Sequence, residues 1–192
     1  MCKAIPLEIL SIMENKNDRP LVSFIVTTYN LPTTLLCECL QSILSLSLSK
    51  EEREIIVVDD GSEVSPLNDL VELRDKIVYV RQRNKGLSEA RNMGLVCAQG
   101  KFIQFVDGDD YLIQAPYEHC LDIARYKDAD IILFHETEEE QPEVPFECNG
   151  PMTGSAYMHQ YNLRASACGY LFRANILGNL RFTPNLLHED EE

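Results

Sequence analysis

Short apolar runs alternate with stretches of helical periodicity along most of this chain. The runs are rich in β-branched residues, which favour strands, and the stretches between them repeat apolar residues every three or four positions, which favours helices. Chains with this alternation fold around a mainly parallel sheet with helices on both faces. The sequence therefore predicts an α/β fold, an α/β/α sandwich. The predicted strands are residues 22–27, 54–58, 77–80, 102–106 and 131–134, with a short one at 170–172.

Helices are predicted between these strands. Pro32 fits the start of a helix whose apolar face runs through residues 35–44, and Gly100 follows a second helix over residues 87–98. We also expect helices over residues 117–125, 154–163 and 174–180, and a short one after Pro66.

The length and composition favour one domain in a reducing compartment. The 192 residues suit a single domain over residues 21–192, preceded by a short amphipathic helix and linker in residues 1–20. The seven cysteines are odd in number and lack the spacing of a zinc site, so we expect a cytosolic setting. We read no membrane span or secretory leader. The formal net charge of -14 argues against nucleic acid as the main partner.

Polar clusters follow four of the predicted strands at the points where the strands end. Right-handed crossovers bring the carboxyl ends of parallel strands to one edge of the sheet, and open α/β sheets bind ligands outside that edge. We therefore expect the clusters to converge on one site. They are residues 27–30, 59–62, 81–85 and 107–110.

The cluster at 107–110 places three carboxylates around one glycine. Like charges at this spacing are unfavourable unless a cation offsets them, and Mg²⁺-type sites often combine one or two carboxylates with substrate phosphates. The alternative interpretation is a polar turn chosen for its backbone preferences. The four basic residues between 81 and 91 indicate either a contact for phosphates or ordinary solvated surface.

Five segments occur in a characteristic order. They read VSFIVTTYN at 22–30, EIIVVDDGS at 54–62, NKGLSEARNMG at 84–94, DGDD at 107–110 and HEDE at 188–191. Together they resemble the motifs of family 2 glycosyltransferases with the Rossmann-like GT-A fold, over about residues 20 to 192. The resemblance implies a nucleotide-diphospho-sugar donor, usually UDP-linked, with Mg²⁺ or Mn²⁺, and inversion at the anomeric carbon.

The resemblance also implies roles at the base and ribose of the donor. Thr27 and Tyr29 would hold the base by backbone contact and ring packing. Asp60 would accept the imide N–H of uracil, a donor that cytosine lacks, and Asp59 would order the loop or reach the ribose. The alternative for Thr27 is an ordinary strand-end threonine, and the alternative for Tyr29 is a partly buried tyrosine. For Asp59 and Asp60 it is an acidic pair of the receiver-domain type.

Further roles concern the diphosphate. Asp109 is implied as the metal ligand, with Asp107 at the ribose or the metal and Asp110 in support. Lys85 or Arg91 would offset the charge of the diphosphate, and a structural ion pair is the alternative for Arg91.

Asp190 resembles the general base that takes the proton of the acceptor hydroxyl, and the alternative is one charge in an acidic tail. Gly86 and Gly94 are expected to permit close packing. Family members continue past the late acidic motif with helices that close over the acceptor and contact membrane or partner domains, so we expect those elements to be missing here.

The resemblance implies transfer of a sugar to a glycan or lipid-linked acceptor, in surface polysaccharide or glycoconjugate synthesis, in the cytoplasm or at the inner face of the membrane. Two alternatives stay open. One is a sugar-nucleotide-binding module without turnover. The other is a sugar nucleotidyltransferase, which usually carries a glycine-rich basic loop after the first strand, where this chain has TTYNLP at 27–32.

Overall fold

A six-stranded sheet forms the centre of the computed structural model, which describes residues 19–135, 137, 150–162 and 166–186. The strands are β1 (Val22–Thr28), β2 (Arg53–Asp59), β3 (Val78–Arg81), β4 (Phe102–Asp107), β5 (Ile131–Leu133) and β6 (Tyr170–Arg173).

The strand order is β3-β2-β1-β4-β6-β5, and β1, β2, β3 and β4 are mutually parallel. Strand β6 lies between β4 and β5 and runs antiparallel to both. The register aligns the ends of the parallel strands: Thr27 is opposite Asp107 on β4, and Asp59 is opposite Arg81 on β3. The sheet therefore brings the polar strand ends to one edge.

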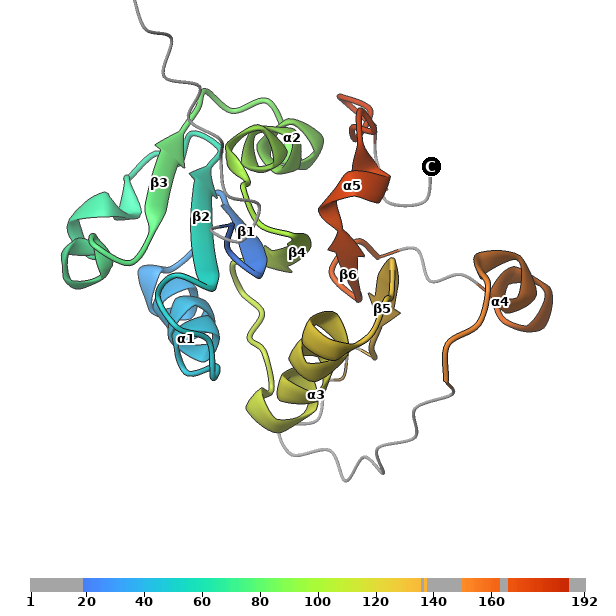
Figure 1. The fold of residues 1–192 in the computed structure, drawn as a ribbon. Helices are drawn as coiled ribbons and strands as arrows, with labels where there is room; N and C mark the ends of the chain where they lie inside the picture. The colour runs from blue at the N-terminus through green and yellow to red at the C-terminus, as the bar shows by residue number, and fades with distance from the viewer. Residues whose placement is uncertain (1–18, 136, 138–149, 163–165, 187–192) are drawn as a thin grey trace, which may run out of the picture.

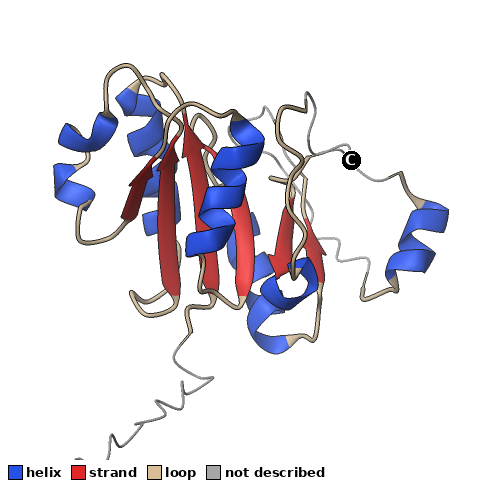
Figure 2. Cartoon of the chain, turned by 90° about the horizontal axis from the view of Figure 1, so that it is seen from above, coloured by secondary structure: helices blue, strands red, loops and turns tan. Residues whose placement is uncertain are grey.

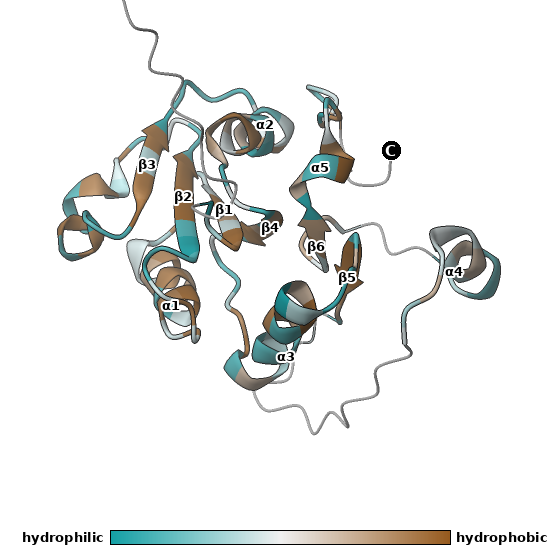
Figure 3. Ribbon diagram, in the orientation of Figure 1, coloured by the Kyte–Doolittle hydropathy of each residue, from teal (hydrophilic) through white to brown (hydrophobic). Residues whose placement is uncertain are grey.

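Helices cover both faces of the sheet, as Figure 2 shows from above. Along β1, Phe24 and Val26 join the core that contains α1 and α3, whereas Ile25 joins the core beneath α2, because successive strand side chains point to opposite faces. Hydrophobic residues concentrate in the strands and on α1, whereas α3 carries both hydrophobic and hydrophilic residues (Figure 3). The helices are α1 (Thr33–Leu44), α2 (Leu87–Cys97), α3 (Gln114–Tyr126), α4 (Gly154–Gln160) and α5 (Ala174–Leu177), with short 3₁₀ turns η1 (Pro66–Asn68) and η2 (Val71–Leu73).

The mainly parallel α/β sandwich is confirmed, and the elements that form it agree with the predicted ranges to within a few residues (Figure 1). Three helix ends differ. The helix predicted over 87–98 stops at Cys97, because Ala98 is extended, and the one predicted over 154–163 stops at Gln160. The helix predicted over 174–180 is a single turn, since Gly178 leaves it with a φ of 46°. The amphipathic helix predicted within residues 1–20, around residues 6–13, lies outside the described residues.

Across the described parts of the chain, every helix is too short or too polar to cross a bilayer.

Candidate functional site

A cleft of about 470 Å³ opens at the carboxyl ends of β1, β2 and β4, beside the start of α2. Five residues that the sequence predicts as site residues come together in its wall, from the ends of three strands and the turns that follow them. They are Thr27, Tyr29, Asp60, Asp107 and Asp109. The other described wall residues are Thr28, Leu31, Asn84, Gly86, Leu87, Ala90 and Gly108.

The turn after β4 lies against β1 because its second residue has no side chain. Gly108 donates its N–H to the carbonyl of Thr27 at 3.0 Å, and a Cβ on Gly108 would lie 2.8 Å from the same oxygen. A hydrogen bond of 3.0 Å from the N–H of Asp110 to the carbonyl of Asp107 closes the turn. The glycine thus brings the turn, with Asp107 and Asp109, to the wall of the cleft.

Only one of the two carboxylate oxygens of Asp107 has a protein partner among the described residues. Its Oδ1 accepts from the hydroxyl of Thr27 at 3.4 Å and lies 3.3 Å from Nη2 of Arg91. Its Oδ2 has no protein partner among the described residues, and the side chain is 37% exposed. Asp109 is exposed at the rim of the same wall. Two carboxylates, each with oxygens open to the cleft, are therefore adjacent.

Arg91 lies behind Asp107 and not in the wall of the cleft. Its side chain is only 2% exposed, and the guanidinium lies 5.3 Å from the centre of the Phe182 ring. The geometry thus includes the structural ion pair that the sequence offered as the alternative for this residue. A role in offsetting diphosphate charge stays a prediction, and it would act through Asp107.

Lys85 is exposed, and its side chain is also absent from the wall. Its contribution to the described site comes from the backbone, since its N–H donates to Asp60 at 2.9 Å.

Asp60 is 5% exposed and collects three hydrogen bonds. Oδ1 accepts from Nε2 of Gln82 at 2.7 Å and from the N–H of Lys85 at 2.9 Å, while Oδ2 accepts from the N–H of Gly86 at 2.8 Å. An ionised carboxylate offers about four acceptor positions. One position on Oδ2 therefore remains for a donor on a ligand in the cleft.

Asp59 is fully buried and lies outside the cleft wall. It accepts from the N–H of Ser62 at 2.8 Å and the hydroxyl of Tyr79 at 2.7 Å, and lies 3.4 Å from Nε of Arg81. Burial by itself raises the pKa of Asp59, but the bonds from Ser62 and Tyr79 and the charge of Arg81 outweigh it and hold the pKa below its ordinary value. Of its two predicted roles, the geometry matches ordering of the loop.

The two glycines expected to permit close packing differ. A Cβ on Gly94 would lie 2.2 Å from Cγ2 of Ile25, so this glycine does let α2 approach β1 closely. For Gly86 that expectation is wrong. Nothing lies within 4 Å of a Cβ built there, and the residue has a φ of 89°, a backbone conformation that glycine adopts without strain.

Sequence reasoning missed two polar contributors, Gln82 and Asn84. Gln82 supplies a donor to Asp60, and Asn84 lines the cleft. The sequence placed the cluster at 81–85 at this edge of the sheet, but it gave individual roles only to charged members of that stretch. Which of its uncharged side chains face Asp60 or the cleft depends on the fold, so position after the strand predicts the cluster and not these two roles.

The turn at 107–110 fits a cation only in combination with other ligands. Among the described residues, no group of three or more His, Cys, Asp or Glu side chains could enclose a metal ion. A hard cation that keeps water and takes substrate phosphates needs only one or two carboxylates, and Asp109 and Asp107 supply that number. The carboxylates of the turn also affect the thiol of Cys39 on α1. Burial of this thiol is the largest cause, followed by the negative charges of Asp110, Asp107 and Asp109, and together they raise the pKa of Cys39 to about 12.

Asp190, the predicted general base, lies outside the described residues, as does the rest of the late acidic motif. The described chain that precedes it is anchored to α2. Asn92 donates to the carbonyl of Phe182 at 2.8 Å and accepts its N–H at 2.9 Å, and the Phe182 ring packs edge-on against Phe105.

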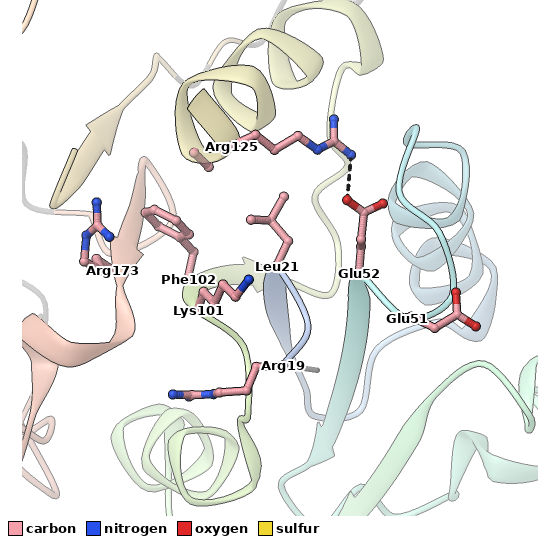
Figure 4. Close-up of a pocket in the computed structure, with 9 residues that line it drawn as sticks. Arg19, Leu21, Glu51, Glu52, Lys101, Phe102, Arg125 and Arg173 are labelled. Atoms are coloured by element: carbon pink, nitrogen blue, oxygen red, sulfur yellow. Dashed lines mark hydrogen bonds and ion pairs between the residues drawn. The ribbon is translucent and has the colours of Figure 1, made fainter. Parts of the chain in front are cut away.

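A second hollow, of about 630 Å³, lies at the amino ends of the parallel strands (Figure 4). Two of its three arginines are paired with carboxylates: Arg125 with Glu52 at 3.4 Å, and Arg173 with Asp128 at 2.9 Å and Asp130 at 3.2 Å. None of the predicted site residues lines it. The cleft at the carboxyl ends is therefore the candidate site.

The fold and the position of the cleft define an open α/β protein with its candidate site outside the carboxyl ends of the strands. The sequence model of "Glycosyl transferase family 2" matches residues 23–161, and the chain belongs to this family.

Curated relatives are similar over most of this chain. "Uncharacterized glycosyltransferase EpsJ" of Bacillus subtilis is 36% identical over 134 residues, covering 66% of this chain and 38% of EpsJ. "Minor teichoic acid biosynthesis protein GgaB" of the same organism is 27% identical over 173 residues, covering 85% of this chain and 19% of GgaB. The chain thus spans well under half the length of these relatives.

Solved structures show the same fold. S. aureus TarS 1-349 in complex with UDP-GlcNAc has a TM-score of 0.72 and 26% identity, covering 88% of this chain and 51% of that one. The fold is accordingly GT-A, as the resemblance implies.

Proposed function

We propose that this chain is the donor-binding part of an inverting glycosyltransferase that moves a sugar from a UDP-sugar to a hydroxyl of a glycan or lipid-linked acceptor. The observation that carries the proposal is the convergence of Asp60, Asp107 and Asp109 in the wall of one cleft. Membership of glycosyl transferase family 2 and the similarity to a TarS complex with UDP-GlcNAc support it.

The base of the nucleotide would lie between Tyr29 and Asp60. The open position on Oδ2 of Asp60 suits one N–H donor, which the imide of uracil provides. Thr27 and Thr28 form the adjoining wall at the end of β1. Asp59 would not contact the base, and would instead hold the loop that carries Asp60.

The diphosphate would lie over the turn at 107–110. Asp109, with Asp107, would hold Mg²⁺ or Mn²⁺ together with phosphate oxygens, and the ion would offset the charge that develops on the leaving diphosphate. Arg91 keeps Oδ1 of Asp107 engaged, which leaves Oδ2 for the ribose or the ion. Lys85 would add positive charge at the rim.

The transfer step would be a single displacement. The acceptor oxygen forms a bond to the anomeric carbon on the face opposite the nucleotide, the bond from that carbon to the diphosphate oxygen breaks with its electron pair, and the configuration inverts. Asp190 would take the hydroxyl proton. General-base catalysis of this kind typically contributes about 10²–10⁴-fold in rate.

The name of the relative GgaB supports a cell-wall polymer as the acceptor class. With this acceptor, the reaction would take place at the cytoplasmic face of the membrane, where sugar nucleotides are available.

Calorimetric titration of the full chain with UDP, in Mn²⁺ and in EDTA, tests the donor site. We expect binding that needs the cation and that Asp109→Asn abolishes, with Asp69→Asn, an exposed carboxylate that bonds to Thr33 and is absent from the cleft wall, as the control. Equal UDP affinity in EDTA and in Asp109→Asn would contradict the metal role. Release of UDP from UDP-sugars tests turnover, and Asp190→Asn should keep UDP affinity while losing release.

A further inference from the structure

Two loops at the edge of the cleft are joined by a reciprocal pair of hydrogen bonds. The N–H of Asn30 donates to Oγ of Ser62 at 2.9 Å, and the N–H of Glu63 donates to Oδ1 of Asn30 at 2.7 Å. We call this pair of bonds between Asn30 and the 62–63 loop the clasp. It connects the end of β1 to the end of β2 outside the sheet ladder.

The clasp holds Asn30 in an unfavourable backbone conformation. Asn30 has a φ of 50°, in the left-handed region that residues other than glycine seldom occupy, although asparagine tolerates it better than most. Such strain persists where surrounding contacts impose it, and it is concentrated at functional sites. Both the backbone N–H and the side-chain carbonyl of Asn30 are used for this purpose.

Buried Asp59 and the exposed Arg81 fix Ser62 from behind the clasp. Its N–H donates to Asp59 at 2.8 Å, and its carbonyl accepts from the guanidinium of Arg81. The hydroxyl of Tyr79 donates to the other oxygen of Asp59 at 2.7 Å and lies 3.0 Å from Oγ of Ser65. Ser62 is itself only 3% exposed, so these contacts hold it in place as the acceptor for the N–H of Asn30.

Tyr29 is the residue that this arrangement orients. It stands between the last residue of β1 and Asn30, lines the cleft, and is 51% exposed, so few contacts of its own ring fix its direction. The backbone path through Asn30 therefore sets the direction in which the Tyr29 side chain leaves the main chain.

We propose that Asn30 and Ser62 are positioning residues that hold the Tyr29 ring at the angle at which it packs against the base of the donor nucleotide. The inference rests on the proposed function, because it requires a nucleotide in the cleft. Packing of a base on an aromatic ring depends on the placement of the ring, so a loosened clasp reduces affinity through the base alone.

Calorimetric titrations of the full chain with UMP, UDP and Mn²⁺-pyrophosphate test this inference. Ser62→Ala removes the acceptor for the Asn30 N–H, and we expect roughly fivefold weaker binding of UMP and UDP, the factor that loss of one neutral hydrogen bond ordinarily gives. Pyrophosphate binding should not change. Asn30→Gly removes the other bond and carries the same test independently, since glycine adopts a positive φ freely.

Controls separate positioning from general loosening. Ser45→Ala removes a hydroxyl that bonds to a backbone carbonyl at 2.8 Å, far from the cleft, and should bind UMP like the unaltered chain. Asn30→Asp keeps the acceptor for Glu63 and should restore affinity. In a Tyr29→Ala background, Ser62→Ala should have no further effect.

Unchanged UMP affinity in both clasp variants, weakened pyrophosphate binding, or effects that add to those of Tyr29→Ala would overturn the inference and leave the proposed function standing. Failure of the unaltered chain to bind UMP or UDP would instead overturn the proposed function, and the inference with it.

Discussion

Replacing Asp60 with asparagine should weaken both the fold and the binding of UDP. The carboxylate accepts Gln82 and Lys85 on Oδ1 and Gly86 on Oδ2. If the amide oxygen of the introduced asparagine takes the place of Oδ1, its NH₂ group faces the N–H of Gly86, donor against donor. The substitution therefore loses one hydrogen bond to a charged acceptor and the open acceptor position in the cleft.

The size of the effect follows from these contacts. A hydrogen bond to a charged group contributes about 1.5–3 kcal/mol, so the free energy of unfolding should fall by about 2 kcal/mol. For a domain of this length that corresponds to a melting temperature about 4–8 °C lower. Loss of the acceptor position at Oδ2 should weaken the binding of UDP by a similar free energy, which corresponds to about 30-fold in affinity.

Denaturant unfolding and calorimetric titration measure the two effects separately. Asp69→Asn is a matched control, because Asp69 accepts one hydrogen bond from Thr33 at 2.9 Å on an exposed surface. The control should change stability by only a few tenths of a kcal/mol. An Asp60→Asn protein that binds UDP as tightly as the unaltered chain would refute the assignment of Asp60 to the base.

Three further outcomes are expected. Gly108→Ala, whose Cβ would lie 2.8 Å from the carbonyl of Thr27, should lower the free energy of unfolding by about 1–3 kcal/mol in urea, whereas Gly154→Ala, with open space around it, should not. The pKa of Asp59 lies below its ordinary value of 3.8, so its stabilisation is complete above that pH and is lost as pH falls through the lowered pKa; Asp59→Asn should flatten acid denaturation there. Cys39, with a pKa of about 12, should resist iodoacetamide at pH 8 in the native state and react once unfolded, as mass spectrometry would show.

The parallel strands and the position of the cleft could be predicted because their signals are local. Each strand is a short β-branched run, and the residues that line the cleft follow directly after the strands along the chain. The parallel direction then brings Thr27 beside Asp107 without further information. Strand β6 was harder, since its place between β4 and β5 depends on pairing between distant segments, which no local pattern specifies.

The roles of individual charged residues depend on partners far away in sequence. Asp59 and Asp60 are adjacent and chemically identical, yet Tyr79 and Arg81 hold the first inside the protein, while the second faces the cleft. Arg91 is likewise covered by Phe182, which lies far along the chain. The sequence could predict which residues gather at this edge, but not which of them face a ligand.

A crystal structure of the chain with UDP and Mn²⁺ is the most direct test of the central claim, that this cleft binds a nucleotide diphosphate through Asp60 and Asp109. The anomalous signal of manganese locates the ion independently of the nucleotide. We expect the ion bonded to the carboxylate of Asp109 and to phosphate oxygens, with the uracil between Tyr29 and Asp60. Uracil elsewhere, or manganese away from the turn at 107–110, would contradict the account.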